Sequence, residues 1–240
     1  MDDIFARNKL LYGEDYLKKI QNKHVAVFGL GGVGGFALEA LARAGVENFT
    51  IVDFDTVSPS NINRQLIALN STIGEKKSSL FQKRLADINP NIKLRVFDEF
   101  YSEETSEKIF DTKFDYVIDA IDTMKSKILL LKTAHKKGIP TATSLGAGNR
   151  KNPTEFYICD ISEIEKINDN FTKNVLRQLA KDGITQGITA VCSRELPTKP
   201  AQKNITTSGE VKKIEIGSTP FAPAIAGYYL GYTAFEELLK

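Results

Sequence analysis

Cysteine is scarce in this chain of 240 residues: only Cys159 and Cys192 occur, with no Cys-x-x-Cys pair. Two cysteines are too few for a disulfide framework or for a zinc site with four cysteine ligands. Both lie in apolar, strand-like segments, so we expect them to be buried and chemically inert. The two histidines, His24 and His135, have no neighbouring partner in sequence that would indicate catalysis.

Long hydrophobic runs are also missing, because no stretch of 18 apolar residues occurs. The most apolar segment, Phe221–Leu239, is interrupted by one proline, two glycines and two acids (Pro223, Gly227, Gly231, Glu236 and Glu237), which predicts a buried terminal helix rather than a membrane span. The N-terminus is polar and charged, unlike a signal peptide. We therefore expect a cytoplasmic protein without a membrane partner.

An excess of one charge is absent as well. The chain has 32 Lys and Arg against 30 Asp and Glu, a formal net charge of +2, and ordinary fractions of apolar (42%) and charged (26%) residues. One stretch, residues 171–213, holds eight Lys and Arg against three acids. This surplus of five is either a surface for a polyanion or a solvated loop, and the sequence leaves both open.

Strand-like and helical segments alternate along the first 150 residues. Strands are expected at 24–28, 48–53, 92–97, 115–119 and 140–144, and helices at 3–21, 33–44, 74–89, 102–111 and 123–137. This order predicts an α/β fold with a Rossmann-like, doubly wound, mostly parallel sheet that binds ligands at the carboxyl ends of its strands. Further strands (155–160, 190–194) and helices (169–181, 221–239) follow.

We expect one domain with three parts. Residues 1–22 form an N-terminal helical arm, 23–148 a nucleotide-binding core, and 149–240 a C-terminal part that contains β-structure. The helical pattern of the arm places its apolar residues on one packed side: Leu10, Leu11, Tyr16, Leu17 and Ile20. The C-terminal part includes a flexible loop at about 182–213, because its second half (195–213) is rich in Pro, Lys, Thr and Ser and lacks periodicity.

A glycine-rich turn follows the first strand. Glycines occupy five of seven positions between this strand and a helix: Gly29, Gly31, Gly32, Gly34 and Gly35. Glycine allows a tight turn and a close approach to phosphates, and a helix N-terminus offers free N–H groups and the positive end of its dipole. The turn therefore predicts nucleotide binding without choosing the nucleotide.

Residues after the second strand favour ATP over NAD. Asp53 ends that strand, where it can accept hydrogen bonds from ribose hydroxyls. Arg64 and Lys77 supply the fixed positive charge that a triphosphate needs. A dinucleotide site built mainly from backbone groups does not need them.

Other polar residues accompany these cations. The amides of Asn61 and Gln65 follow closely in sequence, and Asp55 faces the same cleft if the chain stays extended. Asp55 then serves the metal or substrate side, or is only a solvated carboxylate. Asp119 and Asp122, at the end of a later strand, can hold Mg²⁺ through oxygen ligands and water, while Asp122 is equally suited to cap the next helix.

Together these residues resemble the adenylating family that activates ubiquitin and bacterial sulfur-carrier proteins. The resemblance covers residues 4 to about 148 and rests on Gly29-x-Gly31-Gly32-x-Gly34, Asp53-Phe-Asp55, Ser60-Asn61-x-Asn63-Arg64-Gln65, Gly74-x-x-Lys77 and Asp119-x-x-Asp122. It implies that the chain binds ATP and adenylates a carboxylate with release of pyrophosphate.

The resemblance also implies a role for each site residue. Arg64 and Lys77 hold the phosphates, Asp122 serves Mg²⁺, and Arg7 is donated across a homodimer interface to the partner's ATP. All four are implied to be catalytic. The nucleotide-binding set contains Gly29, Gly31, Gly32, Gly34, Asp53, Asp55, Asn61, Arg64, Gln65 and Lys77.

The missing zinc cysteines point to one subgroup. The chain resembles the ATP-dependent tRNA threonylcarbamoyladenosine dehydratases in Arg7-x-x-Leu10-Leu11-Tyr12-Gly13, in Gly146-Ala-Gly148 and in the segment from Gly217 to Gly227. In that group a carboxylate on the modified adenosine is adenylated, the ureido group closes onto it, and AMP leaves. This implies a tRNA partner bearing threonylcarbamoyladenosine and a monovalent cation, Na⁺ or K⁺, and it allows a sulfur-relay protein as a further partner.

Three other functions fit parts of the pattern. An adenylyltransferase for a small sulfur-carrier protein would use the same chemistry on a protein C-terminus. An NAD-dependent oxidoreductase and a non-catalytic nucleotide-binding scaffold share the glycine-rich turn, but neither explains the full set of phosphate-binding residues.

Overall fold

The computed structural model describes residues 3–165, 169–198 and 216–240, and in this part seven strands form one sheet. Their order is β3-β2-β1-β4-β5-β7-β6, and all neighbours are parallel except β6 and β7. The strands are β1 (His24–Phe28), β2 (Asn48–Val52), β3 (Lys93–Phe97), β4 (Tyr116–Asp119), β5 (Thr141–Ser144), β6 (Phe156–Asp160) and β7 (Thr189–Ser193). The predicted Rossmann-like, mostly parallel sheet is confirmed.

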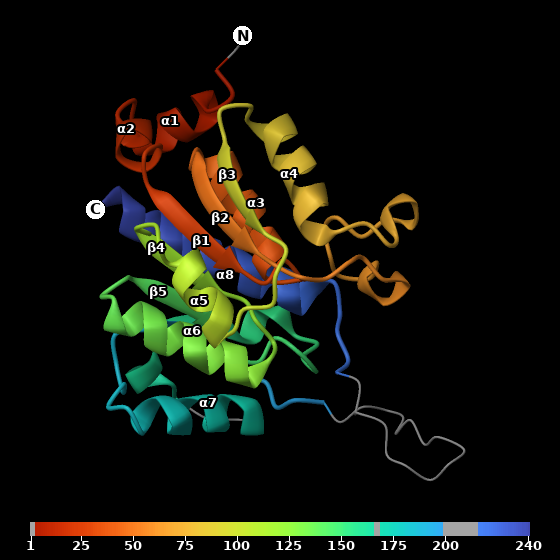
Figure 1. Cartoon of the computed structure of the whole chain (residues 1–240), viewed down its shortest axis with the longest axis vertical. Helices are drawn as coiled ribbons and strands as arrows, with labels where there is room; N and C mark the ends of the chain where they lie inside the picture. The colour runs from red at the N-terminus through yellow and green to blue at the C-terminus, as the bar shows by residue number, and fades with distance from the viewer. Residues whose placement is uncertain (1–2, 166–168, 199–215) are drawn as a thin grey trace.

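Helices cover both faces of this sheet (Figure 1). On one face lie α3 (Gly34–Ala44), α4 (Lys77–Ile88) and α8 (Phe221–Leu239), and on the other α5 (Glu103–Ile109), α6 (Met124–Lys136) and α7 (Asn170–Ala180). The central strand β1 shows why: Val25 and Val27 pack toward α3 and α8, whereas Ala26 and Phe28 pack toward α5 and α6. A strand buried on both faces reads as a continuous apolar run.

The α8 helix lies against α3 because two glycines allow the backbones to approach. A Cβ atom at Gly227 would lie 2.3 Å from the Val33 carbonyl oxygen, and one at Gly231 would lie 3.1 Å from the Ala37 carbonyl oxygen. The buried terminal helix predicted for 221–239 is confirmed. No helix in the described ranges combines the length and apolarity needed to span a membrane.

The N-terminal arm differs from the prediction of one helix over 3–21. Two short helices form instead, α1 (Ala6–Tyr12) and α2 (Tyr16–Ile20), because Gly13 has φ +85°, which ends the first helix. Tyr16 and Ile20 are buried as expected, but Leu10 and Leu11 are 78% and 82% exposed. The prediction that Leu10 and Leu11 lie on a packed side of the helix is therefore wrong within a single chain.

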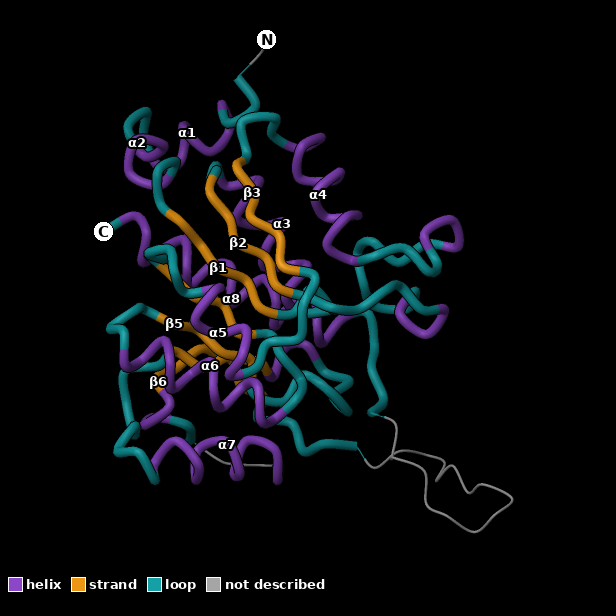
Figure 2. Tube along the Cα trace, viewed as in Figure 1, coloured by secondary structure: helices purple, strands orange, loops and turns teal. Residues whose placement is uncertain are grey.

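A second difference concerns the segment before α4, which was predicted to start at residue 74. Gly74 has φ +88° and Lys76 bridges to Thr56, so the helix begins only at Lys77. Residues 56–76 form a loop with two short 3-10 turns, Pro59–Asn61 and Asn70–Thr72, which projects from the body (Figure 2).

The loop expected at about 182–213 is interrupted by β7, which pairs with β5 and β6 and buries Ala190 and Val191 in the core. The strand predicted at 190–194 is thus present at 189–193. Most of the remaining loop, residues 199–213, lies outside the described residues.

Candidate functional site

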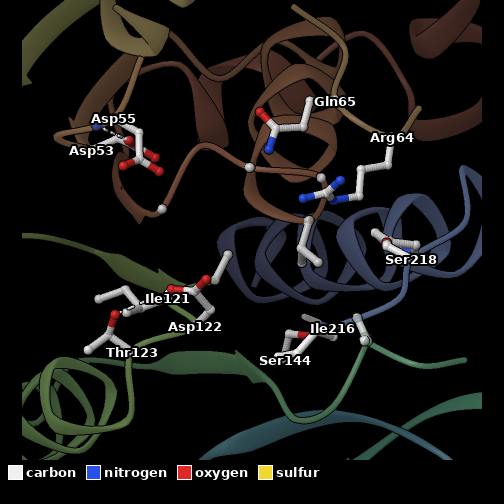
Figure 3. A pocket seen from close by; sticks show the side chains of 18 of the residues that line it. Asp53, Asp55, Arg64, Gln65, Ile121, Asp122, Thr123, Ser144, Ile216 and Ser218 are labelled. Carbon is white, nitrogen blue, oxygen red and sulfur yellow. Dashed lines mark hydrogen bonds between the residues drawn. The ribbon is translucent and has the colours of Figure 1, made fainter. Parts of the chain in front are cut away.

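A cavity of about 540 Å³ opens at the carboxyl ends of β1, β2, β4 and β5. This is where a doubly wound sheet binds its ligands, at the point where strand order reverses between β1 and β4. Figure 3 shows Asp53 and Asp55 on one side of the cavity, Arg64 and Gln65 above it, and Asp122 with Ser144 on the opposite wall.

The glycine-rich turn needs its glycines for two different reasons. Gly29 has φ +87°, and a Cβ there would lie 2.7 Å from the Ala120 carbonyl oxygen. A Cβ at Gly34 would lie 1.8 Å from the Gly29 carbonyl oxygen, so the turn closes only without side chains. Within the described chain no side chain caps the start of α3. The N–H groups of Gly35 and Phe36 already donate to the Gly31 and Val33 carbonyl oxygens (both 3.1 Å), which leaves the N–H of Gly34 and the positive end of the helix dipole for an anion.

Asp53 is tied to this turn at the end of β2. Its carboxylate accepts hydrogen bonds from the backbone N–H groups of Leu30 (2.6 Å) and Asp55 (2.8 Å). Burial raises the pKa of this carboxyl above its ordinary value, and the nearby Lys77 opposes the rise. The carboxylate therefore lies in the cavity wall in a fixed orientation, and its binding of a ribose stays a prediction.

Lys77 and Asp55 form an ion pair in the cavity. The Lys77 Nζ donates to Asp55 Oδ2 at 2.7 Å, and the lysine is only 4% exposed whereas about half of the Asp55 side chain is exposed. Lys77 is the first residue of α4, so its ammonium is added to the positive end of that helix dipole. Asp55 holds this charge at the cavity surface.

Arg64 and Gln65 enter from the projecting loop. The Arg64 guanidinium donates to the Ser60 carbonyl oxygen (2.7 Å) and to Asn63 Oδ1 (2.9 Å), and its backbone lies against Gly32. Gln65 is 8% exposed, and its Oε1 has no hydrogen-bond partner among the described residues. A buried acceptor without a donor is a place where a ligand hydroxyl or amine fits. Asn61 is buried beside them and accepts from the Ser58 N–H.

The two aspartates at the end of β4 have different surroundings. Asp119 is fully buried and accepts hydrogen bonds from Lys127 Nζ (2.6 Å), Thr143 Oγ1 (2.7 Å) and the Ile121 N–H (3.1 Å). The expectation that Asp119 binds Mg²⁺ is therefore wrong, because its oxygens are already occupied. Asp122 is exposed and lines the cavity.

The alternative that Asp122 caps a helix is not observed, because α6 has Thr123 at its N-cap. The described residues contain no group of three or more carboxylate, histidine or cysteine ligands. Mg²⁺ is often bound by one or two carboxylates together with substrate phosphates and water, so Asp122 fits such an ion when a nucleotide is present.

Arg7 does not line the cavity. It is an exposed residue of α1 at the opposite end of the sheet from the glycine-rich turn (Figure 1). A role for Arg7 therefore requires a second chain. Cys192 is buried and Cys159 is half-buried, and neither lines the cavity.

Sequence reasoning missed several lining residues. The rings of Phe54 and Phe100 meet edge to face at 5.1 Å and are about half exposed (56% and 42%), which offers an apolar surface for a base. Phe54 lies inside the Asp53-Phe-Asp55 motif, and Phe100 follows β3 by three residues, so strand-end position was the available signal. Arg150 and Ile216 line the cavity from segments with no recognisable motif.

Comparison with known proteins gives consistent results. Residues 5–229 match the model of the ThiF family. The chain is 42% identical to tRNA threonylcarbamoyladenosine dehydratase of Bacillus subtilis (strain 168), over 98% of this chain and 94% of that protein. It is 30% identical to the protein of the same name from Escherichia coli (strain K12), over 98% and 92%.

Solved structures agree with these matches. A crystal structure of the E. coli tRNA N6-threonylcarbamoyladenosine dehydratase in complex with ATP superposes with a TM-score of 0.86 at 29% identity, covering 98% of this chain and 93% of that one. The same protein in complex with AMP gives a TM-score of 0.87.

Proposed function

Because the chain belongs to the ThiF family, we propose that it catalyses the ATP-dependent dehydration of threonylcarbamoyladenosine in tRNA. One observation carries the proposal: a single cavity combines a glycine-rich turn with Arg64, Lys77 and Asp122, in a chain similar over nearly its whole length to named dehydratases. The ATP and AMP complexes of the E. coli protein support a nucleotide in this position.

The reaction has two steps. A carboxylate oxygen of the threonyl unit attacks the α-phosphorus of ATP, the bond to the β-phosphate oxygen breaks, and pyrophosphate leaves. The ureido group of the same nucleoside then attacks the acyl carbon, loses a proton and expels AMP. The product has lost one water, whose atoms are accounted for by the cleavage of ATP to AMP and pyrophosphate.

The cavity residues have complementary roles in this chemistry. The turn before α3 and the cations Arg64 and Lys77 bind the phosphates and stabilise the negative charge that develops in the transition state. Asp53 orients the ribose, and Gln65 offers its unpartnered acceptor to the nucleoside. Asp122 would hold Mg²⁺, which supplies charge neutralisation on the phosphates. We assign no ligands to a monovalent cation, and a sulfur-relay partner rests on the resemblance alone.

Ring closure needs no nucleophile from the protein. The attacking group is tethered to the acyl carbon, and well-oriented intramolecular reactions reach effective molarities of about 10⁵ M or more. The position of both cysteines outside the cavity is consistent with this route.

The α7 helix supplies a surface for the tRNA. Lys173 and Arg177 lie four residues apart on it, Lys181 follows at its C-cap, and all three are exposed, so they lie on one side of the helix. Asp169 and Phe171 at the start of α7 line the cavity, so this basic stripe leads away from the site. Such a stripe binds phosphates with an affinity that falls as salt rises. A tRNA substrate favours a cytoplasmic location.

A homodimer completes the proposal. Leu10, Leu11 and Tyr12 form an exposed apolar surface on α1, where the Tyr12 ring packs edge to face on Phe235 of α8 at 5.0 Å, and a second copy would bury this surface. The same helix carries Arg7, which would then reach the partner's nucleotide.

Incubation with ATP, Mg²⁺ and tRNA tests the function. We expect nucleoside mass spectrometry to show loss of one water from threonylcarbamoyladenosine, with AMP formed, only when the tRNA carries this modification. The control is the same tRNA without it. No mass change, together with AMP formation on the C-terminal peptide of a sulfur-carrier protein, would instead establish the carrier-activating function.

A further inference from the structure

The cavity extends beyond the residues assigned to the nucleotide. Its second wall is built by the loop after β5, residues 146–150, by the start of α7, and by Pro197, Ile216 and Ser218. Figure 3 shows Ile216 near Ser144, on the side of the cavity opposite Arg64, and Ser218 beside Arg64. This wall has no role in the reaction described above, which still requires a place for the carboxylate.

Arg150 is the one arginine of this wall, and its guanidinium is buried. The residue is 2% exposed, its Nε donates to the Gly146 carbonyl oxygen (3.2 Å), and its Nη2 donates to Asp169 Oδ2 (3.0 Å). Its Nη1 has no acceptor among the described residues. Burial lowers the pKa of this group, and Asp169 and Glu195 oppose the shift, but an arginine stays protonated at neutral pH.

The surroundings hold this guanidinium in one orientation. Asp169 caps α7 by accepting hydrogen bonds from the Thr172 N–H (2.8 Å) and hydroxyl (3.0 Å), so the ion pair is anchored to a helix terminus. Gly146 has φ +90°, and a Cβ there would lie 3.1 Å from Asp169 Oδ2. The loop and the helix thus hold Nε and Nη2 of Arg150 and leave Nη1 for a ligand.

We propose that Arg150 positions the acceptor by binding the carboxylate that is to be adenylated. This inference rests on the proposed function, which requires a carboxylate in the same cavity as the nucleotide. A planar guanidinium matches a carboxylate, and the phosphates already have Arg64 and Lys77. A hydrogen bond from Nη1 to one carboxylate oxygen leaves the other oxygen for attack on phosphorus.

The substitution R150Q tests this role in the full-length protein. We expect the KM for modified tRNA to rise about ten- to a hundredfold, as for loss of a hydrogen bond to a charged group, while the Kd for ATP stays unchanged. The matched control R177Q removes the same charge from the basic stripe on α7. It should weaken the binding of modified and unmodified tRNA by equal factors. An unchanged KM in R150Q, or an equal loss of ATP affinity, would overturn the proposal.

Two further measurements separate positioning from structural support. The variant D169N keeps the Arg150 guanidinium but weakens its ion pair. It should therefore retain the preference for modified over unmodified tRNA that R150Q loses.

If R150Q does not fold, the wild-type protein provides the test. The threonylcarbamoyladenosine nucleoside should inhibit the enzyme about ten- to a hundredfold better than its carboxyl methyl ester. Equal inhibition contradicts the proposal. Absence of any dehydration by the wild type, in contrast, contradicts the proposed function itself.

Discussion

Lys127 and Asp119 form an ion pair beneath the cavity with 1% and 0% of their side chains exposed. Each charge is costly to bury alone, but Thr143 and the Ile121 N–H supply the remaining hydrogen bonds. The pair fixes the backbone between Asp119 and Asp122, so a buried residue of α6 helps to place the exposed carboxylate in the cavity.

Replacing Lys127 by Met should lower the free energy of unfolding by about 3–5 kcal/mol, because Asp119 then keeps a buried charge without its partner. Urea denaturation measures this loss. The same substitution at Lys125, an exposed residue two positions earlier on α6, should change stability by no more than about 0.5 kcal/mol. Equal stability of the two variants would show that the buried pair contributes nothing.

The proposed phosphate-binding role of Arg64 can be tested by a single substitution. The variant Arg64→Ala should lower kcat/KM by about 10²-fold or more, since it removes a donor to the charge formed in the transition state, without unfolding the protein. Turnover is followed by nucleoside mass spectrometry, and the fold by circular dichroism. Arg43→Ala, at the far end of α3 from the cavity, is the control and should remain active. ATP consumption at the wild-type rate in Arg64→Ala would contradict the assignment.

At the scale of elements, the strands and helices of the nucleotide-binding core were predictable, because their signals are local. Apolar strands end at Gly29, Asp53 and Asp119, and the polar residues that follow meet at one edge of a parallel sheet. Contacts between distant segments were not predictable from periodicity. The ion pairs of Asp119 with Lys127 and of Asp169 with Arg150 depend on packing, which gives no sequence signal.

The contact between α8 and α3 leads to a prediction against helix propensity. Gly→Ala in an exposed helix stabilises by about 1 kcal/mol, but Gly227→Ala would place a methyl group 2.3 Å from the Val33 carbonyl oxygen. We expect Gly227→Ala to destabilise by about 1–3 kcal/mol and to weaken ATP binding, because Val33 belongs to the glycine-rich turn. In Gly231→Ala the nearest contact of the new methyl group would be 3.1 Å, so this variant should lose less stability, as measured by thermal unfolding. A larger loss of stability in Gly231→Ala than in Gly227→Ala would contradict this account of the packing.

At the scale of the whole molecule, the single chain leaves α1 incompletely packed. Leu10 and Leu11 looked like core residues in the sequence but are exposed, and Arg7 lies outside the cavity. A helical pattern shows which residues share a face, and it does not show whether that face packs within the chain or against a second one. The proposed homodimer accounts for all three residues.

Mixing two inactive variants tests the dimer. Arg7→Ala and Arg64→Ala should each be inactive, but a mixed dimer has one site with an intact Arg64 that receives Arg7 from the other protomer. Random assembly of co-expressed variants should therefore restore about a quarter of the wild-type activity. Separately purified and unexchanged variants serve as the control. Failure of the mixture to recover any turnover would exclude sharing of Arg7 between chains.

The position of α8 has a consequence for how the protein is made. This last helix supports the turn before α3, and Ser218, just before it, accepts a hydrogen bond from the Asn63 side chain at the nucleotide site. Chains emerge from the ribosome N-terminus first. The glycine-rich turn is therefore synthesised some 190 residues before the helix that braces it, and a nascent chain lacks this support for ATP binding until α8 has been made. Chains that stop before α8 would thus bind ATP more weakly than chains that contain it.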